Sequence, residues 1–439
     1  MRDRNRWRNW GRNQSCTPAA VEQPESELEV AEAVRRAHSA GQTVKVAGAG
    51  HSFTDIACTD GRLLHLDRLD RVVALDPDAR TVTVEGGIPL WKLNEELARR
   101  DLALPNLGDI DRQSISGAIA TATHGGGKRF GGLATFVTAL ELVTADGDLL
   151  RCSADEEPEL FACARVGLGA LGVVTKVTLQ CDPDFRLHSI EKPCPLDALV
   201  DDLDEIIDGN EHIDCYWFPH TDVATVKVAN RTDEPLRPRR PWKAWRDDIL
   251  LANYLFGALA AVGRLRPSAV PTLMRSVARG LGKTEVVDTS HRVLCSTRLV
   301  RFVEMEYAIP RAELGKTLLR VRDLIEGEGL RIDFPIELRV AAADDIALST
   351  AQGRETGYLA VHLSAGTPFD RYFHGVEAIM NDLGGRPHWG KMHYQRAETL
   401  APRYPEWARF QAVRSRLDPD GRFRNPYLDR VLGPSRRAT

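Results

Sequence analysis

The glycine-rich loop in VAGAGHSFTDIACTDG, residues 46–61, constrains the fold more than any other feature of the sequence. A helix is predicted before it at residues 26–41, because S-E-L-E forms a capping box and Gly41 follows the apolar pattern as a C-cap. A strand at residues 43–47 leads into the loop, and short alternating runs typical of strands follow it. The predicted order is therefore helix, strand, glycine loop and further strands.

This order excludes a Rossmann dinucleotide site, in which the loop opens a helix whose N-terminus holds the pyrophosphate. Glycines still let a diphosphate approach the main chain, where successive backbone N–H groups can surround it. A tight turn between two strands explains the same glycines equally well. Neither interpretation explains His51, which follows the last glycine of the loop.

A second segment, GDIDRQSISGAIATATHGGG at residues 108–127, is rich in small and hydroxyl-bearing side chains. The hydroxyls belong to Ser114, Ser116, Thr121 and Thr123, and His124 precedes three glycines. Small side chains allow a bulky group to come close to the backbone. The alternative is a tightly packed helix that stops at the glycines.

The rest of the pattern predicts an α+β protein. Helices are expected at residues 89–100 and 158–166, two strands around the Asp146-Gly147 turn, and a glycine turn with a strand at residues 167–181. Beyond Asp182-Pro183 the composition changes, and a mostly antiparallel sheet is favoured there. The elements expected in that part are a helix at residues 195–208 and strands at residues 213–218, 224–229, 299–309, 332–341 and 357–366.

Two further stretches interrupt this pattern. The Pro/Arg-rich residues 233–242 are predicted to form a surface loop. The apolar residues 249–263 are too few for a membrane span, which needs about 20 residues. A core helix is the interpretation, with a helix lying on a membrane surface as the alternative.

Composition limits the class of partner and the compartment. The formal net charge of -4 argues against a nucleic-acid partner. The eight cysteines form no CxxC pair, and no apolar run follows the basic N-terminus, so no signal peptide is predicted. Free thiols in a reducing cytoplasm are expected.

Four motifs occur in a fixed order: VAGAGHSFTDIACTDG, GDIDRQSISGAIATATHGGG, FPIELR and RPHWGKMHY. Together they resemble the sugar-1,4-lactone oxidases, the L-gulono-, D-arabinono- and L-galactono-lactone oxidoreductases of the vanillyl-alcohol-oxidase flavoprotein superfamily, with the alditol oxidases as close relatives. The resemblance runs from residue 7 to residue 427. It implies an FAD-binding domain of this (PCMH) type at residues 1–182, a cap domain with an antiparallel sheet at residues 183–400, and a C-terminal segment, 401–439, that returns to the FAD domain.

The resemblance also implies the cofactor and its contacts. FAD is expected to be bonded covalently to His51, because a neutral imidazole nitrogen can attack the activated 8α-methyl group. The alternative is a histidine that only contacts the flavin ring. The other residues expected to bind FAD are Ala47, Gly48, Ala49, Gly50, Ser52, Ser114, Ser116, Gly117, Ala120, Thr121, Thr123, His124, Gly125, Val173, Val174 and Lys391.

The reaction centre is predicted from the FPIELR and HWGK motifs. Glu337 and Arg339 lie two residues apart on a strand, so both project from one face about 6–7 Å apart. Alone, this spacing fits an ion pair on a solvated strand equally well. The resemblance assigns Glu337 to a hydrogen bond from the substrate hydroxyl, Arg339 to the developing alkoxide, and Lys391 to the anionic reduced flavin.

The same resemblance gives further site residues. Ser116 is expected to approach both flavin and substrate, which makes it the fourth catalytic prediction. His362 and Ser364, which share a strand face by spacing, and His388 are predicted to bind substrate. No metal site is predicted.

The implied activity is oxidation of the C2 hydroxyl of an aldono-1,4-lactone to an ascorbate-type product, by hydride transfer to flavin N5. One alternative is an alditol oxidase acting on the C1 hydroxyl of xylitol or sorbitol. Another is a non-catalytic flavin- or sugar-binding protein. The electron acceptor is O2 or a cytochrome- or quinone-type acceptor, with Gly117 as a residue that could control oxygen access, and membrane contact is not favoured.

Overall fold

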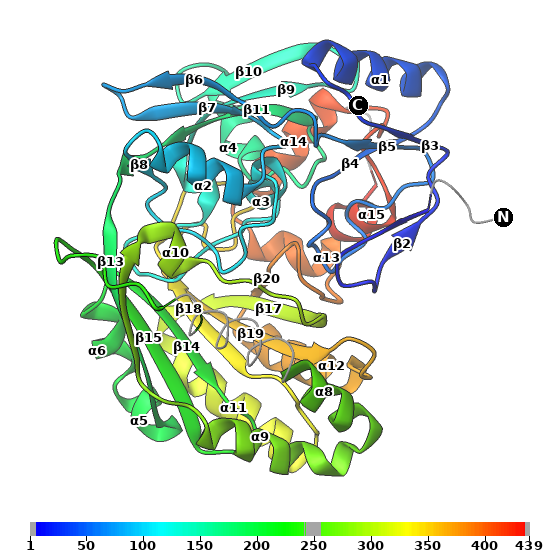
Figure 1. Ribbon diagram of the computed structural model, residues 1–439. Helices are drawn as coiled ribbons and strands as arrows, with labels where there is room; N and C mark the ends of the chain where they lie inside the picture. The colour runs from blue at the N-terminus through cyan, green and yellow to red at the C-terminus, as the bar shows by residue number, and fades with distance from the viewer. Residues whose placement is uncertain (1–5, 241, 243–255, 435–439) are drawn as a thin grey trace.

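The computed structural model describes residues 6–240, 242 and 256–434 and has two lobes, the first built on several sheets and the second on one large sheet (Figure 1). The first lobe contains a five-stranded antiparallel sheet of order β10-β9-β11-β7-β6 and a parallel three-stranded sheet of order β3-β5-β4. The bounds are β3 (Ala20–Glu22), β4 (Val44–Ala47), β5 (Arg62–His65), β6 (Val72–Asp76), β7 (Thr81–Glu85), β9 (Val137–Val143), β10 (Leu149–Ser153) and β11 (Val173–Gln180). Two-stranded pairs are formed by β1 (Trp7–Arg8) with β2 (Ser15–Cys16) and by β8 (Leu102–Ala103) with β12 (Asp182–Pro183).

The helices of the first lobe are α1 (Glu27–Ser39), α2 (Leu90–Ala98), α3 (Ile115–Ala120) and α4 (Pro158–Ala164). The predicted cap of α1 is confirmed, because the Ser26 hydroxyl accepts a hydrogen bond from the Glu29 N–H at 3.2 Å. The Glu29 carboxylate accepts from the Glu25 N–H instead of completing the box at Ser26. β4 then leads from α1 into the glycine loop, and β5, not a helix, follows that loop.

The C-terminal segment packs against the first lobe. Its helices are α13 (Ala397–Leu400), α14 (Trp407–Leu417) and α15 (Pro426–Leu432). Phe410 and Tyr427 lie in the same hydrophobic core as residues of α2, α3 and α4, and the Val44 N–H donates to the Arg422 carbonyl at 2.8 Å. The first and the last described segments therefore belong to one lobe, while the residue boundaries proposed for the domains stay predictions.

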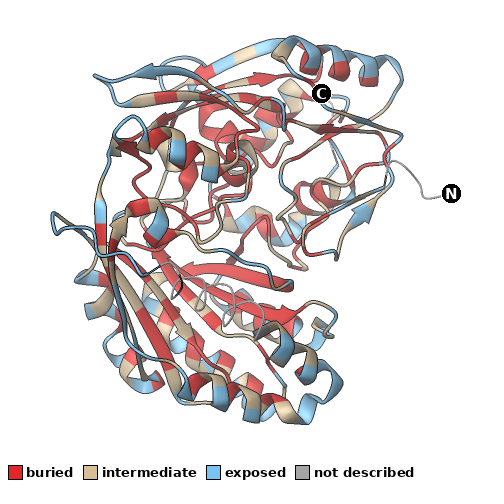
Figure 2. Cartoon of the chain, viewed as in Figure 1, coloured by how far each residue is buried: buried red, intermediate tan, exposed pale blue. Residues whose placement is uncertain are grey.

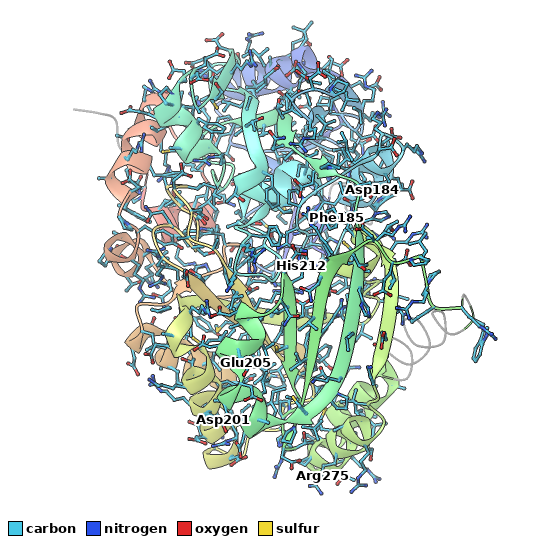
Figure 3. All side chains as sticks on the ribbon, turned by 90° about the vertical axis from the view of Figure 1, so that its left-hand side faces the viewer. Asp184, Phe185, Asp201, Glu205, His212 and Arg275 are labelled. Carbon is cyan, nitrogen blue, oxygen red and sulfur yellow. The ribbon has the colours of Figure 1, made fainter. Side chains whose placement is uncertain are left out.

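The second lobe is an eight-stranded sheet of order β16-β13-β15-β14-β18-β19-β17-β20, in which every neighbouring pair is antiparallel. This confirms the predicted antiparallel sheet. Its strands are β13 (Arg186–Pro195), β14 (His212–Trp217), β15 (Val223–Thr232), β16 (Thr284–Thr289), β17 (Phe302–Pro310), β18 (Ile336–Ala341), β19 (Thr356–Ser364) and β20 (Arg386–Pro387). The chain enters this sheet just after Asp184 and Phe185, which lie at the junction of the lobes together with His212 (Figure 3).

Helices cover the sheet face that points away from the first lobe (Figure 1). They are α5 (Leu196–Asp201), α6 (Leu203–Asp208), α11 (Leu314–Gly327) and α12 (Asp370–Asp382). The single helix predicted at residues 195–208 is wrong, because Asp202, with ψ near 3°, ends α5 and begins α6. Three further helices of this lobe are not part of that layer: α8 (Phe256–Leu265), α9 (Val270–Arg279) and α10 (Ser290–Leu294).

Two sequence predictions fall partly outside the described residues. Residues 249–255 of the predicted core helix are not described, and the remainder lies in α8, where Val262 is 44% exposed. A helix is therefore confirmed for residues 256–263, but the exposed Val262 contradicts its prediction as a core helix. Residues 233–240 form the predicted exposed loop, and residue 241 lies outside the description. None of the described helices has the length and apolar character needed to cross a membrane, and all eight cysteines are free.

The two faces of the second sheet differ in chemistry, because successive side chains of a strand point to opposite faces. On β17, Val303, Met305 and Tyr307 pack into the core beneath the helices, whereas Glu304 and Glu306 point to the other face. Both sets are buried, as the red central strands of Figure 2 show. The first lobe therefore covers the polar face of the second sheet, and the candidate site lies where the two lobes meet.

Candidate active site

A cavity enclosing about 1070 Å³ of space, its solvent mouth included, lies within the first lobe. The glycine loop, α3 with the residues before it, and the turn at residues 167–172 form its walls. The predicted cofactor residues that line it are Gly48, Ala49, Gly50, His51, Ser52, Ser114, Ser116, Gly117, Ala120, Thr121, Val173 and Val174. The structure thus brings the two small-residue motifs and the start of β11 together around one space.

The walls of this cavity fit a large cofactor with polar atoms. Gly48 and Ser114 approach so closely that a Cβ atom on Gly48 would lie 2.3 Å from the Ser114 hydroxyl oxygen. That buried hydroxyl has no hydrogen-bond partner among the described residues, so it is free to bond a ligand. The short helix α3 reconciles both interpretations of its segment, since it is tightly packed and also lines the cavity.

His51 lies at the end of the glycine loop, where its ring stacks on Trp10 with the ring centroids 5.3 Å apart. Burial and the nearby Arg112 lower the pKa of His51 to about 4. The imidazole is therefore neutral at physiological pH, which is the form that acts as a nucleophile or as a hydrogen-bond partner. The covalent bond to flavin stays a prediction.

Five of the predicted cofactor residues do not line this cavity: Ala47, Thr123, His124, Gly125 and Lys391. Ala47 is the fully buried last residue of β4. His124 and Gly125 leave the cavity and run toward the second lobe, where the Gly127 N–H donates to the Val340 carbonyl at 2.9 Å. These residues connect the cavity to the polar face of the second sheet.

Glu337 and Arg339 share that polar face, as their spacing predicts. Arg339 Nη2 lies 2.8 Å from Glu337 Oε1, and Arg339 Nε donates to Asp214 Oδ1 at 2.5 Å. The Tyr216 hydroxyl donates to Glu337 Oε1 at 2.7 Å. All of these groups are shielded from bulk solvent by the first lobe, so the solvated-strand interpretation does not apply.

Lys391 reaches the same face because the HWGK segment continues along the sheet edge beyond β20. The His388 N–H donates to the Glu306 carbonyl at 3.0 Å, and the Met392 N–H donates to the Glu304 carbonyl at 2.8 Å. The Lys391 ammonium contacts Glu304 and lies 3.1 Å from Glu306 Oε2.

The HWGK segment also contacts the cavity. The Gly390 carbonyl accepts from the Phe53 N–H at 2.7 Å, next to the glycine loop. A Cβ on Gly390 would lie 3.3 Å from the hydroxyl oxygen of Ser52 and 3.4 Å from that of Thr121, both of which line the cavity. The segment therefore joins the cavity to the carboxylates of the second lobe.

The charged groups on the polar face, Glu304, Glu306, Glu337, Arg339 and Lys391, form one cluster. Of the predicted substrate residues, the two histidines lie in this cluster. His362 Nε2 lies 3.3 Å from Glu304 Oε1, and one ligand-type atom each of His362, Glu304 and Glu337 falls within 4.8 Å of the others. His388 comes equally near to His124 and Glu306. Ser364 lies farther along β19, where its N–H donates to Asp333 at 3.2 Å and its hydroxyl has no hydrogen-bond partner among the described residues.

Burial and neighbouring charges set the ionisation of the cluster. Burial raises the pKa of Glu337, and the cation Arg339 only partly offsets this, because Asp214 and Asp109 add negative charge. Burial also acts on Glu304, but Lys391 and His362 outweigh it and lower the pKa of Glu304 to about 2. The pKa of Lys391 is raised above its usual value despite burial, since Glu304 and Glu306 favour the ammonium. Lys391 is thus a cation, and Glu337 binds a proton more readily than an ordinary carboxylate.

The sequence did not identify four residues that complete the cluster: Glu304, Glu306, Asp214 and Tyr216. Glu304 and Glu306 stand at alternate positions of the strand predicted at residues 299–309, the same spacing as Glu337 and Arg339. That repeated spacing was the available signal. Alternating charges also mark ordinary solvent-facing strands, so the signal does not single out a buried site.

Known proteins share both the fold and the sequence. Residues 18–153 match a family described as FAD binding domain, and residues 177–431 match one described as D-arabinono-1,4-lactone oxidase. Solved structures of the same fold include a solvent-stable cholesterol oxidase, 18% identical with a TM-score of 0.84, over 98% of this chain and 97% of that one. Cholesterol oxidase from B. sterolicum is 19% identical with a TM-score of 0.81, over the same shares.

Fold and site together define an FAD-binding oxidoreductase of the vanillyl-alcohol-oxidase type. Curated relatives include the L-gulono-1,4-lactone dehydrogenase of Mycobacterium tuberculosis, 47% identical over 98% of this chain and 99% of that protein. The L-gulonolactone oxidase of Bos taurus is 36% identical over 97% and 98% of the two chains. The chain belongs to the D-arabinono-1,4-lactone oxidase family. This confirms the predicted resemblance and FAD as the cofactor.

Proposed function

We propose that this protein oxidises the C2 hydroxyl of an aldono-1,4-lactone, with L-gulono-, D-arabinono- and L-galactono-1,4-lactone as the substrates to test. The observation that carries the proposal is the buried pair of Glu337 and Arg339 beside Lys391, at the point where HWGK meets the cavity. The relatives named for lactone oxidation support this substrate class. Bound FAD would supply the two-electron acceptor for the hydride of the substrate C–H bond.

The residues of the cluster have complementary tasks in this reaction. Glu337, whose pKa is raised, accepts the hydrogen bond and then the proton of the reacting hydroxyl. Arg339 stays charged and stabilises the negative charge that develops on the oxygen. The Tyr216 hydroxyl, which donates to Glu337, holds the carboxylate in place.

Lys391 and Ser116 act at the cofactor in this proposal. The ammonium of Lys391 would favour the negative charge that FAD gains on reduction. Ser116 lines the cavity and its N–H donates to the Gly86 carbonyl at 3.1 Å, which fixes its backbone. His51, neutral and at the cavity wall, would hold the flavin covalently.

Anaerobic mixing of the purified holoenzyme with each compound tests the substrate. Loss of the oxidised flavin absorbance with at least one of the three lactones is expected, and xylitol and sorbitol serve as the alditol comparison. Reduction by xylitol and by no lactone would replace this proposal with the alditol alternative. Reduction by none of them would leave only flavin binding. A Lys391→Met variant should be reduced at least about tenfold more slowly, with Lys283→Met as an exposed control.

The acceptor and the flavin linkage need separate measurements. A hydrogen peroxide assay under air, beside a cytochrome c reduction assay without oxygen, separates an oxidase from a dehydrogenase. Precipitation in acid should leave the yellow colour with wild-type protein and release it from His51→Ala. Colour released from the wild type would instead show that His51 only contacts the ring.

A further inference from the structure

Four buried groups and the half-buried Lys391 form a continuous chain across the site: His362, Glu304, Lys391, Glu306 and His124. Lys391 at the centre contacts both carboxylates, and each carboxylate contacts one histidine. The distances are 3.3 Å from His362 Nε2 to Glu304 Oε1 and 2.6 Å from His124 Nε2 to Glu306 Oε1. We call this set the Lys391 chain.

The outer nitrogens of the two histidines fix where their protons lie. His124 Nδ1 is 3.0 Å from the Gly125 carbonyl oxygen, and His362 Nδ1 is 3.1 Å from the Pro335 carbonyl oxygen. A carbonyl oxygen only accepts hydrogen bonds, so both Nδ1 atoms must carry a proton. With its proton on Nδ1, each Nε2 can only accept, and it faces a carboxylate oxygen that also only accepts. The two atoms attract each other only if a further proton lies between them. The 2.6 Å hydrogen bond between His124 and Glu306 therefore requires one shared proton, and the 3.3 Å contact between His362 and Glu304 is the same kind of pair at longer range.

This proton count decides the charge around Lys391. If both histidines were neutral, the two carboxylates and the ammonium would give the Lys391 chain a net charge of about -1 by formal counting. With one shared proton in each pair, the pairs are neutral and the single positive charge of Lys391 remains. Among the neighbouring groups, Glu337 and Asp214 share the cation Arg339, and His388 is neutral because burial lowers its pKa to about 3. These groups are the same in the wild type and in each variant of the Lys391 chain.

We propose that His124 and His362 are positioning residues that neutralise Glu306 and Glu304, so that the charge of Lys391 remains available to the negative charge FAD gains on reduction. The inference rests on the proposed role of Lys391 at the flavin. The carboxylates fix the position of the ammonium, while the histidines prevent them from cancelling its charge. Tyr358, stacked on the His124 ring with the centroids 3.5 Å apart, holds that ring in the required orientation.

The test is the midpoint potential of the bound FAD, measured by reductive titration of the holoenzyme against a reference dye without any sugar substrate. His124→Gln leaves the Glu306 carboxylate uncompensated, so the potential should become more negative. The double variant His124→Gln/Glu306→Gln removes both members of a neutral pair, so its potential should return to the wild-type value. His362→Gln and His362→Gln/Glu304→Gln should behave in the same way.

Glu377→Gln is the matched control, because Glu377 is also a buried carboxylate of the second lobe but bonds Tyr307 and Tyr394 on the helix side of the sheet. The midpoint potential of FAD bound to this variant should equal that of the wild type. An unchanged potential in the single histidine variants, or double variants as negative as the singles, would overturn the proposal. Should a His124 variant fail to bind FAD, the His362 pair decides the question alone. The potential is measured without any sugar, so it does not depend on the proposed function. If the potential shifts as expected but no lactone reduces the enzyme, the proposed function fails and this inference stands.

Discussion

At the scale of single residues, Asn425 shows how the C-terminal segment supports the cofactor loop. Its side-chain NH2 donates to three carbonyls, those of Asp55 and Ile56 at 3.0 Å and of Cys58 at 2.9 Å. Its side-chain oxygen accepts from the Leu428 N–H at 2.9 Å and caps α15. One buried amide therefore holds the chain just after His51 against a helix more than three hundred residues away.

Asn425→Asp keeps the shape and the helix cap but replaces the donor by a carboxylate facing three carbonyl oxygens. We expect a loss of roughly 2–4 kcal/mol in the free energy of unfolding, from unsatisfied carbonyls and a buried charge. Urea unfolding followed by circular dichroism measures it. Ser26→Asp is the control, since it puts the same residue at the half-buried N-cap of α1 and should change stability little. Equal stability of both variants would contradict this account.

The site residues differ in how far the sequence could identify them. His51 and the Glu337–Arg339 pair stand in distinctive motifs, and the structure places them at the cavity wall and on the buried polar face. Glu304 and Glu306 stand in a strand whose alternation also fits a solvent-exposed face. Only the packing of the first lobe on that face makes them buried, and packing between distant segments cannot be read from a local pattern.

At the scale of elements, the glycines after His124 bring the cofactor lobe against the second sheet. A Cβ on Gly126 would lie 1.8 Å from the carbonyl oxygen of Ile213 in β14. Gly127, with φ near 147°, donates its N–H to Val340 at the other side. Because backbone and not a flexible side chain limits the space, no side chain fits at Gly126 without moving β14 away.

Gly126→Ala should therefore separate His124 from Glu306 and destabilise the fold by about 3 kcal/mol or more. Thermal unfolding measures the loss, and the flavin absorbance spectrum reports the altered site. Gly327→Ala, in α11 where nothing lies within 4 Å of an added Cβ, should leave stability unchanged or raise it by about 0.5–1 kcal/mol. A stable Gly126→Ala with a normal flavin spectrum would argue against the close contact.

The local sequence pattern predicted the presence of helices and strands more reliably than the residues at which they begin and end. The capping serine of α1, the turn between β9 and β10 and the alternation of β18 are signals carried by neighbouring residues, and the corresponding elements are present. The continuation of HWGK along β17 depends on contacts with another segment, which a local pattern does not contain. The break between α5 and α6 falls at Asp202, a residue of low helix propensity.

At the scale of the whole molecule, buried histidines lie where the two lobes meet. His212 of β14 bonds Asn106 of the first lobe at 3.2 Å and stacks on Phe130. The ring centroid of His388 lies 5.9 Å from that of His124, and His393 bonds the Tyr427 hydroxyl of α15 at 3.1 Å. Each ring is more than nine-tenths shielded from solvent. The contact between the lobes thus depends on imidazoles that are held neutral.

Acid should therefore weaken the contact between the lobes. Burial lowers the pKa of His212 to about 4 and of His388 to about 3, and it lowers that of His393 as well. Because the folded-state pKa values lie below the unfolded value of about 6.5, the unfolded chain binds more protons in between. Their contribution to stability is complete above pH 6.5 and is lost as the pH falls toward 4.

We expect each of these histidines to cost about 1 kcal/mol of unfolding free energy between pH 7.5 and pH 5.5, well before most carboxylates titrate. Urea unfolding at pH 7.5, 6.5 and 5.5 measures the slope, and His212→Gln should remove about 1 kcal/mol of the loss over this range while keeping a side-chain donor for Asn106. His38→Gln, on the exposed surface of α1, is the control and should leave the slope unchanged. A stability that stays constant over this range would show that the lobes hold together without neutral histidines between them.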